Sequence, residues 1–276
     1  EDHEEINIPR IIQTGGGLFE EVSDLNGIAL PAMYFDEIQG HKRDGEQVLK
    51  DMIQSTVQEM RENRHVYLKN CVKEIVDTCE TPADYLYLAN VYVAIQERLY
   101  SKLKQINKTD YTWITLEIKE KCVSRLNKNL GHEFNKEDEI EVEKQLVHYS
   151  NEPAHDLIDK ALYPYFLNET KFRFSGRLDL LSKTTLWELK CTSKISQEHQ
   201  MQVMIYAWLW RTIYPDCPRE VRIFNLRTGE RQRLDATDEE LTNIVVSLLK
   251  NKYEEPEILD NDDFLLVCRE IVNKYV

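Results

Sequence analysis

Residues 176–210 read GRLDLLSKTTLWELKCTSKISQEHQMQVMIYAWLW, and this stretch decides the fold. Two short apolar runs, residues 171–182 and 184–192, are rich in strand-forming residues and are joined by a Ser-Lys turn, so they predict a β-hairpin. Residues 196–213 follow with the apolar spacing of a helix. The stretch therefore predicts a hairpin whose second strand leads directly into a helix.

Three charged side chains interrupt the apolar strands: Asp179, Glu188 and Lys190. Because strand side chains alternate in direction, Glu188 and Lys190 point to one face and Leu189 to the other. A hairpin that turns at the Ser-Lys pair brings Asp179 beside Glu188. Carboxylates this close repel each other unless a cation lies between them, and hard oxygen ligands select Mg²⁺ or Mn²⁺. We therefore predict Asp179 and Glu188 as metal ligands and Lys190 as the residue that positions or activates a metal-bound water.

Three elements occur here in a fixed order: an acid at Asp179, Glu-x-Lys at 188–190 and Gln-x-x-x-Tyr at 202–206. In order and spacing they resemble the PD-(D/E)xK nucleases, and within them the RecB-like exonuclease branch. The resemblance covers about residues 139–235. It implies a metal-dependent nuclease that cuts DNA, with single-stranded ends as the favoured substrate.

The resemblance also implies roles for individual residues. The backbone carbonyl of Leu189 is an expected further metal ligand. Gln202 and Tyr206 lie one helical turn apart, as i and i+4 do, and would help to hold the nucleic acid strand. Arg177 and Lys194 belong to a group of basic residues around the expected site, which suggests a local positive groove. The members of this group are Lys171, Arg173, Arg177, Lys183, Lys190 and Lys194.

Other interpretations of the same residues stay open. In one of them, Asp179 is a turn residue and Glu188 and Lys190 form an exposed cross-strand ion pair, although both strands are otherwise apolar. Gln202 and Tyr206 are also compatible with an ordinary amphipathic helix. A nucleic-acid-binding module that has lost cleavage, or an RNA endonuclease of the same fold, would share these motifs.

A further metal ligand from an upstream helix is expected by resemblance. Glu97, in the middle of a strongly helical segment, is our candidate. His132 and Glu133 are rivals, although the glycine before them is typical of a helix C-cap. Glu141 and Glu143 precede the hairpin on a predicted strand, where a solvated face is the favoured interpretation.

Composition limits the remaining possibilities. The chain has 276 residues, 42% of them hydrophobic and 30% charged, which is typical of a globular protein. Its net charge of −14 argues against a protein that coats nucleic acid nonspecifically. No apolar run approaches about eighteen residues, so we expect no membrane span, and no signal peptide is visible.

The six cysteines are scattered and none forms Cys-x-x-Cys. Some RecB-like nucleases carry an iron–sulfur cluster, but only Cys217 and the distant Cys268 are available downstream, so we predict no cluster. Reduced thiols of an intracellular protein, in an unassigned compartment, are the expected state. The glycines at 15–17 are not followed by Gly-Lys-Ser/Thr, so they predict a turn rather than a phosphate loop.

The spacing of apolar residues and the positions of glycine, proline and capping residues predict the remaining elements. Residues 1–45 are expected to be irregular. Helices are expected at 46–79, 82–106, 196–213, 237–252 and 261–275, with a further helix capped by Thr109 that runs to Leu126 and a short helix or irregular insert at 155–166. Strands are expected at 140–149, 220–226 and 231–234, in addition to the hairpin.

These elements predict an α/β fold with a restriction-endonuclease-like core. We expect a small mixed central sheet flanked by helices, preceded by an N-terminal helical extension. The expected domains are an extension or linker at 1–80 and the nuclease domain at 81–276. Because the chain begins with Glu1, we expect it to be a module of a larger protein, and a helicase domain in the same polypeptide is a hypothesis.

Overall fold

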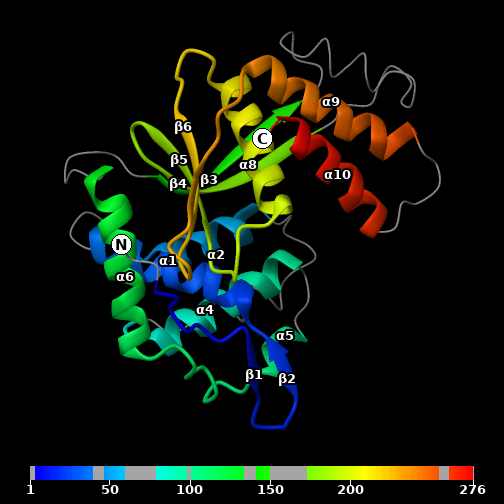
Figure 1. Ribbon diagram of the computed structural model, residues 1–276. Helices are drawn as coiled ribbons and strands as arrows, with labels where there is room; N and C mark the ends of the chain where they lie inside the picture. The colour runs from blue at the N-terminus through cyan, green and yellow to red at the C-terminus, as the bar shows by residue number, and fades with distance from the viewer. Residues whose placement is uncertain are drawn as a thin grey trace. The chain divides into compact units, whose positions relative to one another are not determined.

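The computed structural model describes residues 4–39, 47–59, 79–97, 101–133, 141–149, 173–254 and 261–275. Figure 1 shows its elements, which are β1 (Ile11–Gln13), β2 (Phe19–Glu21), α1 (Ser23–Gln39), α2 (Val48–Glu59), α4 (Pro82–Glu97), α5 (Lys102–Gln105), α6 (Leu116–Leu130), the 3₁₀ turn η1 (Gly131–Glu133), β3 (Glu141–Tyr149), β4 (Arg173–Leu181), β5 (Thr185–Lys190), α8 (Gln197–Ile213), β6 (Glu220–Asn225), β7 (Arg231–Arg233), α9 (Asp238–Glu254) and α10 (Asn261–Tyr275).

The chain forms two compact units. The first contains residues 1–135 with two short returns, 189–193 and 225–229. The second contains 136–188, 194–224 and 230–276. The domain boundary expected at residue 80 adjoins residues 60–78, which lie outside the described part of the chain, and it stays a prediction.

A five-stranded sheet in the order β3-β4-β5-β6-β7 is the centre of the fold. The pairs β3–β4, β4–β5 and β6–β7 are antiparallel. The pair β5–β6 is parallel, because Glu220 N donates to Thr184 O and Leu226 N donates to Lys190 O at the same offset along both strands. The chain crosses between these two strands through α8. The predicted α/β class and mixed sheet flanked by helices are confirmed.

The hairpin forms where the sequence predicts it. Ser182 N donates to Thr185 O at 2.9 Å, and Thr185 N donates to Ser182 Oγ at 3.0 Å. The serine hydroxyl thus replaces a backbone acceptor in the turn. This turn fixes the register of the two motif strands, with Leu180 opposite Trp187 and Leu181 opposite Leu186.

Helix α8 covers one face of the sheet in the second unit. It begins at Ser196, whose hydroxyl accepts from His199 N while His199 Nδ1 accepts from Ser196 N, so both ends of a capping box are present. The helix contacts β3 and β4, and α9 and α10 pack against it in turn (Figure 1). Its apolar side chains bury against the sheet in a core that includes Leu146, Leu178, Met204, Ala207, Trp208 and Leu209.

The first unit is mainly helical, and here one expectation is wrong. Residues 1–45 are not irregular: they contain the β1–β2 hairpin and the 17-residue helix α1. The helix was missed because it is buried on almost every side, so it has no polar face to mark a helical period. Its buried residues include Ala29, Leu30, Ala32, Met33, Tyr34 and Phe35, and Pro31 lies inside it.

A second expectation needs correction at α6. The helix begins at Leu116, not after Thr109, and Thr115 is its cap: Thr115 Oγ1 accepts from Ile118 N at 3.2 Å. Thr109 lies in a turn, where its hydroxyl contacts Asp110. Thr115 directly precedes the helix, whereas Thr109 lies six residues before that cap. Gly131 is the C-cap, as predicted, but in a right-handed conformation.

The helix expected at 82–106 is instead two helices, α4 (Pro82–Glu97) and the short α5 (Lys102–Gln105), so Glu97 is the last residue of α4 and not in mid-helix. Most of the other boundaries agree closely with the predictions. Thr237 and Glu240 form the predicted capping box at α9. The insert expected at 155–166 lies outside the described residues, as does the second half of the helix expected at 46–79. Within the described residues, no helix has the length and apolar character that crossing a bilayer requires.

Candidate functional site

The strand register brings the two predicted acids together. Leu180 pairs with Trp187 and Leu181 with Leu186. Continuing this register by one step places Asp179 opposite Glu188. Opposite residues of an antiparallel pair point to the same face with Cβ atoms about 4.5–5.5 Å apart. The two carboxylates therefore start from neighbouring positions on one face of the sheet.

The burial of these two carboxylates distinguishes them from charged residues at an ordinary protein surface. Glu188 is 3% exposed, and Asp179 is half-buried. A carboxylate seldom lies so deep without a compensating charge or hydrogen bonds. Glu188 lies in a strand of which the first five residues are all buried. The interpretation of Glu188 as one member of an exposed ion pair is therefore wrong.

Lys190 lies two residues further along β5, so it points to the same side of that strand as Glu188. It is half-buried, and Leu189 beside it is 5% exposed. The backbone is fixed at this point, because Leu226 N donates to Lys190 O at 2.7 Å. Leu226, the residue directly after β6, thus holds the end of the Glu-x-Lys element in place.

Gly176 explains how α8 reaches the sheet, a function that the sequence analysis did not assign to it. A Cβ atom at Gly176 would lie 2.6 Å from Tyr206 Cε1 and 2.8 Å from Tyr206 Cδ1. Only glycine allows the tyrosine ring to rest directly on β4. Glycine inside a strand pattern is itself the signal for such a close approach.

The same contact places Tyr206 relative to the acid. Gly176 faces Tyr206, and Leu181 with its partner Leu186 packs in the same core as α8, so Asp179 and Glu188, each two residues from one of them, start on the side of the sheet that α8 covers. Gln202 and Tyr206 act together, since Gln202 Nε2 donates to Tyr206 Oη at 2.8 Å. The predicted contact of this pair with nucleic acid stays a prediction.

Arg177 lies closer to the acids along the sheet. It is opposite Gln145 of β3 and two residues before Asp179. Lys194 is exposed in the segment that leads from β5 to α8. Lys171 lies outside the described residues.

Glu97 is at the last turn of α4 in the first unit. Its side chain is 41% exposed, and its carboxylate lies 2.6 Å from Lys102 Nζ. Its rivals lie in η1, where His132 Nε2 is 3.8 Å from Glu133 Oε1. Within the described ranges, no three His, Cys, Asp or Glu side chains converge as a metal site would require. A fourth ligand is therefore still only predicted.

Glu143 occupies a position that the sequence analysis gave little weight. Its neighbours pair as Val142 with Leu180 and Lys144 with Leu178, so Glu143 falls opposite Asp179. Its φ is 53°, in the left-handed region that costs about 1–2 kcal/mol for a residue with a Cβ. The strand is therefore strained at the position beside the proposed acids.

The described cysteines are free, and all except Cys217 are buried. Burial raises the pKa of Cys122 and of Cys191 to about 12, so neither thiol ionises near neutral pH.

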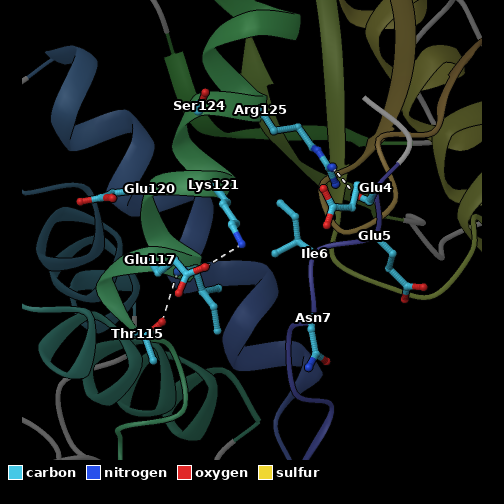
Figure 2. A pocket seen from close by; sticks show the side chains of 11 residues that line it. Glu4, Glu5, Ile6, Asn7, Thr115, Glu117, Glu120, Lys121, Ser124 and Arg125 are labelled. Atoms are coloured by element: carbon cyan, nitrogen blue, oxygen red, sulfur yellow. Dashed lines mark hydrogen bonds and ion pairs between the residues drawn. The ribbon is translucent and has the colours of Figure 1, made fainter. Parts of the chain in front are cut away.

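A separate cavity of about 620 Å³ lies along α6 (Figure 2). Four glutamates and two cations line it, and Lys121 is paired with Glu117 at 2.7 Å. Arg125 points from α6 and donates to the carbonyls of Leu226 (3.0 Å), Arg227 (2.6 Å) and Glu4. The arginine therefore fixes the chain after β6 and the N-terminal segment within the first unit.

Comparison of the chain with protein-family models, curated proteins and solved structures found no match.

Proposed function

We propose that this chain is a divalent-metal-dependent deoxyribonuclease with a restriction-endonuclease-like core, of the RecB-like PD-(D/E)xK type. One observation carries the proposal: the hairpin register aligns Asp179 with Glu188, and Glu188 is buried in a strand that ends in Lys190. A carboxylate pair can hold a divalent ion, and a lysine two residues further on can offset phosphate charge, so this arrangement supports metal-assisted phosphodiester hydrolysis.

The donor set fits Mg²⁺ or Mn²⁺. Asp179 and Glu188 offer hard oxygen atoms from adjacent strands, and the Leu189 carbonyl is the third expected ligand. A hard cation of this kind keeps several waters and accepts a phosphate oxygen, so a full cage of protein ligands is not needed. Bound there, the ion would lower the pKa of a water and offset the charge that develops on phosphorus.

The chain's own residues complete the reaction. Lys190 points to the side of β5 that Glu188 occupies, where its ammonium orients the attacking water and balances phosphate charge. Arg177 and Lys194 supply further positive charge for the phosphates, and Gln202 with Tyr206 positions the strand. Single-stranded DNA is the proposed substrate, and a helicase domain in the same polypeptide is the proposed partner.

Cleavage of end-labelled single-stranded DNA in Mg²⁺ or Mn²⁺ tests the proposal. We expect Asp179→Asn, Glu188→Gln and Lys190→Ala each to reduce the cleavage rate by orders of magnitude while DNA binding persists. Lys250→Ala, which removes an exposed lysine from α9, is the matched control and should cut at the wild-type rate. Labelled RNA is tested in parallel.

Two results would contradict the proposal. Wild-type protein that binds DNA equally well in chelator and never yields product would be a binding module. Preferential cleavage of RNA would assign the same site to an RNA endonuclease.

A further inference from the structure

A pocket of about 570 Å³ lies in the second unit, where the turn between β4 and β5 meets the end of α8. Its volume is within the range of about 300–1,000 Å³ found for sites that hold small organic ligands. Thr184 lines it and is four residues before Glu188, a distance of about 13 Å along a strand. The pocket is therefore separate from the proposed metal site.

Backbone hydrogen bonds build this pocket from segments that are distant in the chain. Glu220 N donates to Thr184 O at 2.9 Å and joins the segment before β6 to the hairpin turn. Leu234 N donates to Val221 O at 2.9 Å and brings the residues after β7 to the same place. The sheet thus fixes the backbone around the pocket.

Arg219 lies half-buried on this pocket without a carboxylate partner. Its guanidinium donates to Ser182 O and stacks 4.8 Å from the centroid of the Trp210 ring. Within the described ranges it forms no ion pair, and its Nε has no hydrogen-bond partner. Withdrawing a charge from water is costly unless an opposite charge compensates it. The position of Arg219 therefore favours an anionic ligand.

Two more cations line the same pocket. Lys183, in the hairpin turn, is exposed and has no ion-pair partner in the part of the chain that the structure describes. Arg233, at the end of β7, is also exposed, and its ion pair with Glu220 is 3.8 Å long, which exceeds hydrogen-bond distance. Three cations from three segments are thus available to one ligand.

The acids of the pocket leave this charge largely uncompensated. Glu220 is paired more closely with Arg222, at 2.5 Å, and Asp238 is paired with Arg211 at 2.8 Å. Asp235 is the third acid that lines the pocket, and it is exposed. A pocket with an excess of positive charge is a local exception in a chain whose net charge is −14.

The pocket also has an apolar lining, which an inorganic ion would not need. Tyr214 is 36% exposed, and its ring packs on Trp210 with the centroids 4.4 Å apart. The other apolar residues of the lining are Pro215, Pro218, Val221 and Leu234. An exposed aromatic ring beside arginines can bind a base by stacking and a phosphate by charge. These features match an anion that carries a ring.

We propose that this pocket binds a nucleoside 5′-monophosphate, with the phosphate on Arg219, Arg233 and Lys183 and the base against the Tyr214 ring. A phosphate presents three oxygens to the three cations, whereas a carboxylate presents two. Stacking on tyrosine accepts any base, so the site selects a phosphate with a ring rather than one particular base. The site goes beyond the proposed function, because none of these residues is a proposed metal ligand or DNA contact.

Isothermal titration calorimetry of the intact chain with AMP, adenosine and inorganic phosphate tests the site. Chelator is present throughout, so that no metal ion recruits the phosphate to Asp179 and Glu188. We expect AMP to bind with a Kd below about 1 mM, and adenosine and phosphate each to bind at least about 10-fold more weakly. Wild type without measurable affinity for AMP would overturn the proposal. Equal affinity for AMP and inorganic phosphate would overturn it too, because the ring would then contribute nothing.

Variants separate the phosphate contacts from the base contact. Arg219→Gln should weaken AMP binding by at least about 10-fold, as expected for loss of a hydrogen bond between charged groups. Arg233→Gln changes an exposed side chain with little effect on folding, and it should weaken binding about 2-fold to about 5-fold. Tyr214→Ala should weaken AMP binding at least about 5-fold and leave the affinity for inorganic phosphate unchanged. Tyr214→Phe, which keeps the ring, should bind AMP as wild type.

Arg269→Gln is the matched control. Arg269 is exposed in α10 and lies close enough to Glu198, at the start of α8, to interact with its charge, whereas Tyr214 follows the other end of that helix. Sixteen residues of helix span about 24 Å, so this variant should bind AMP as wild type. A loss equal to that of Arg233→Gln would overturn the proposal, because the effect would then be one of overall charge.

Two further results would also overturn the proposal. One is wild-type affinity for AMP in both Arg219→Gln and Tyr214→Ala. The other is binding of a 5′-phosphorylated oligothymidine about 10-fold or more tighter than that of thymidine 5′-monophosphate, because the ligand would then be the end of a strand and not a free nucleotide. Since the titrations contain no metal ion, their outcome does not depend on whether the chain cleaves DNA.

Discussion

Gly176→Ala tests the packing on which the geometry of the site depends. The new Cβ would lie 2.6 Å and 2.8 Å from two atoms of the Tyr206 ring and 3.3 Å from Leu209 Cδ1. Carbon atoms pack best at about 3.5–4.0 Å, so the ring must retreat by about 1 Å. Such overpacking costs about 1–3 kcal/mol, while replacing glycine in a strand returns about 0.5–1 kcal/mol. We expect a net loss of about 0.5–2 kcal/mol in the free energy of unfolding.

Urea unfolding followed by tryptophan fluorescence measures this loss, and a double-mutant cycle assigns its cause. In a Tyr206→Ala background the clashing ring is absent, so Gly176→Ala should be neutral or stabilising, which gives a coupling energy of about 1–3 kcal/mol. Gly27→Ala in α1 is the matched control. A Cβ there meets no atom within 4 Å, so it should stabilise the protein by about 0.5–1 kcal/mol.

Equal destabilisation by Gly176→Ala in both backgrounds would refute this reasoning, because the ring contact would then not be the cause. The same variant should also lower nuclease activity, since displacement of Tyr206 disturbs the 2.8 Å hydrogen bond from Gln202.

Three further predictions concern carboxylates. Mn²⁺ at a hundredfold excess over its Kd should raise the unfolding free energy of wild type by about 2.7 kcal/mol, measured in a thermal-shift assay against chelator. Glu188→Gln should lose most of this stabilisation. If the variant keeps all of it, the ion binds elsewhere. Glu143→Gly should be about 1 kcal/mol more stable than Glu143→Ala in urea unfolding, because both lose the carboxylate but only glycine tolerates φ 53° without strain; equal stabilities would contradict this. The backbone N–H and then the hydroxyl of Thr237 lower the pKa of Glu240 below 4.5, so its contribution to stability is present above that pH and is lost as the pH falls through the folded-state pKa. Urea unfolding of Glu240→Gln and wild type should therefore differ at neutral pH and converge as the pH falls below the folded-state pKa, and a constant difference would argue against the linkage.

The sequence predicted much of the second unit because local signals and tertiary packing agree there. A turn serine, two apolar runs and a capped helix specify β4, β5 and α8 almost residue by residue. The alignment of Asp179 with Glu188 followed from the turn position alone, since one residue of register determines the whole pair.

The features that the sequence did not predict depend on contacts between segments that are far apart in the chain. Helix α1 has no polar face, so its helical period is visible only once its neighbours are known. The contact of Tyr206 with Gly176 and the left-handed φ of Glu143 arise from sheet packing that no local pattern records. The position of Glu143 opposite Asp179 likewise needed the register of β3, which is joined to β4 through residues outside the described part.

Strand β5 is an interior strand, with β4 and β6 on either side of it. Its amides should therefore be among the slowest in the protein to exchange with deuterium, because exchange requires two ladders to open together. If the proposed site binds a phosphodiester, β5 would stay rigid beside it, so adjustment to the substrate would come from side-chain rotamers and surface segments rather than from the strand itself.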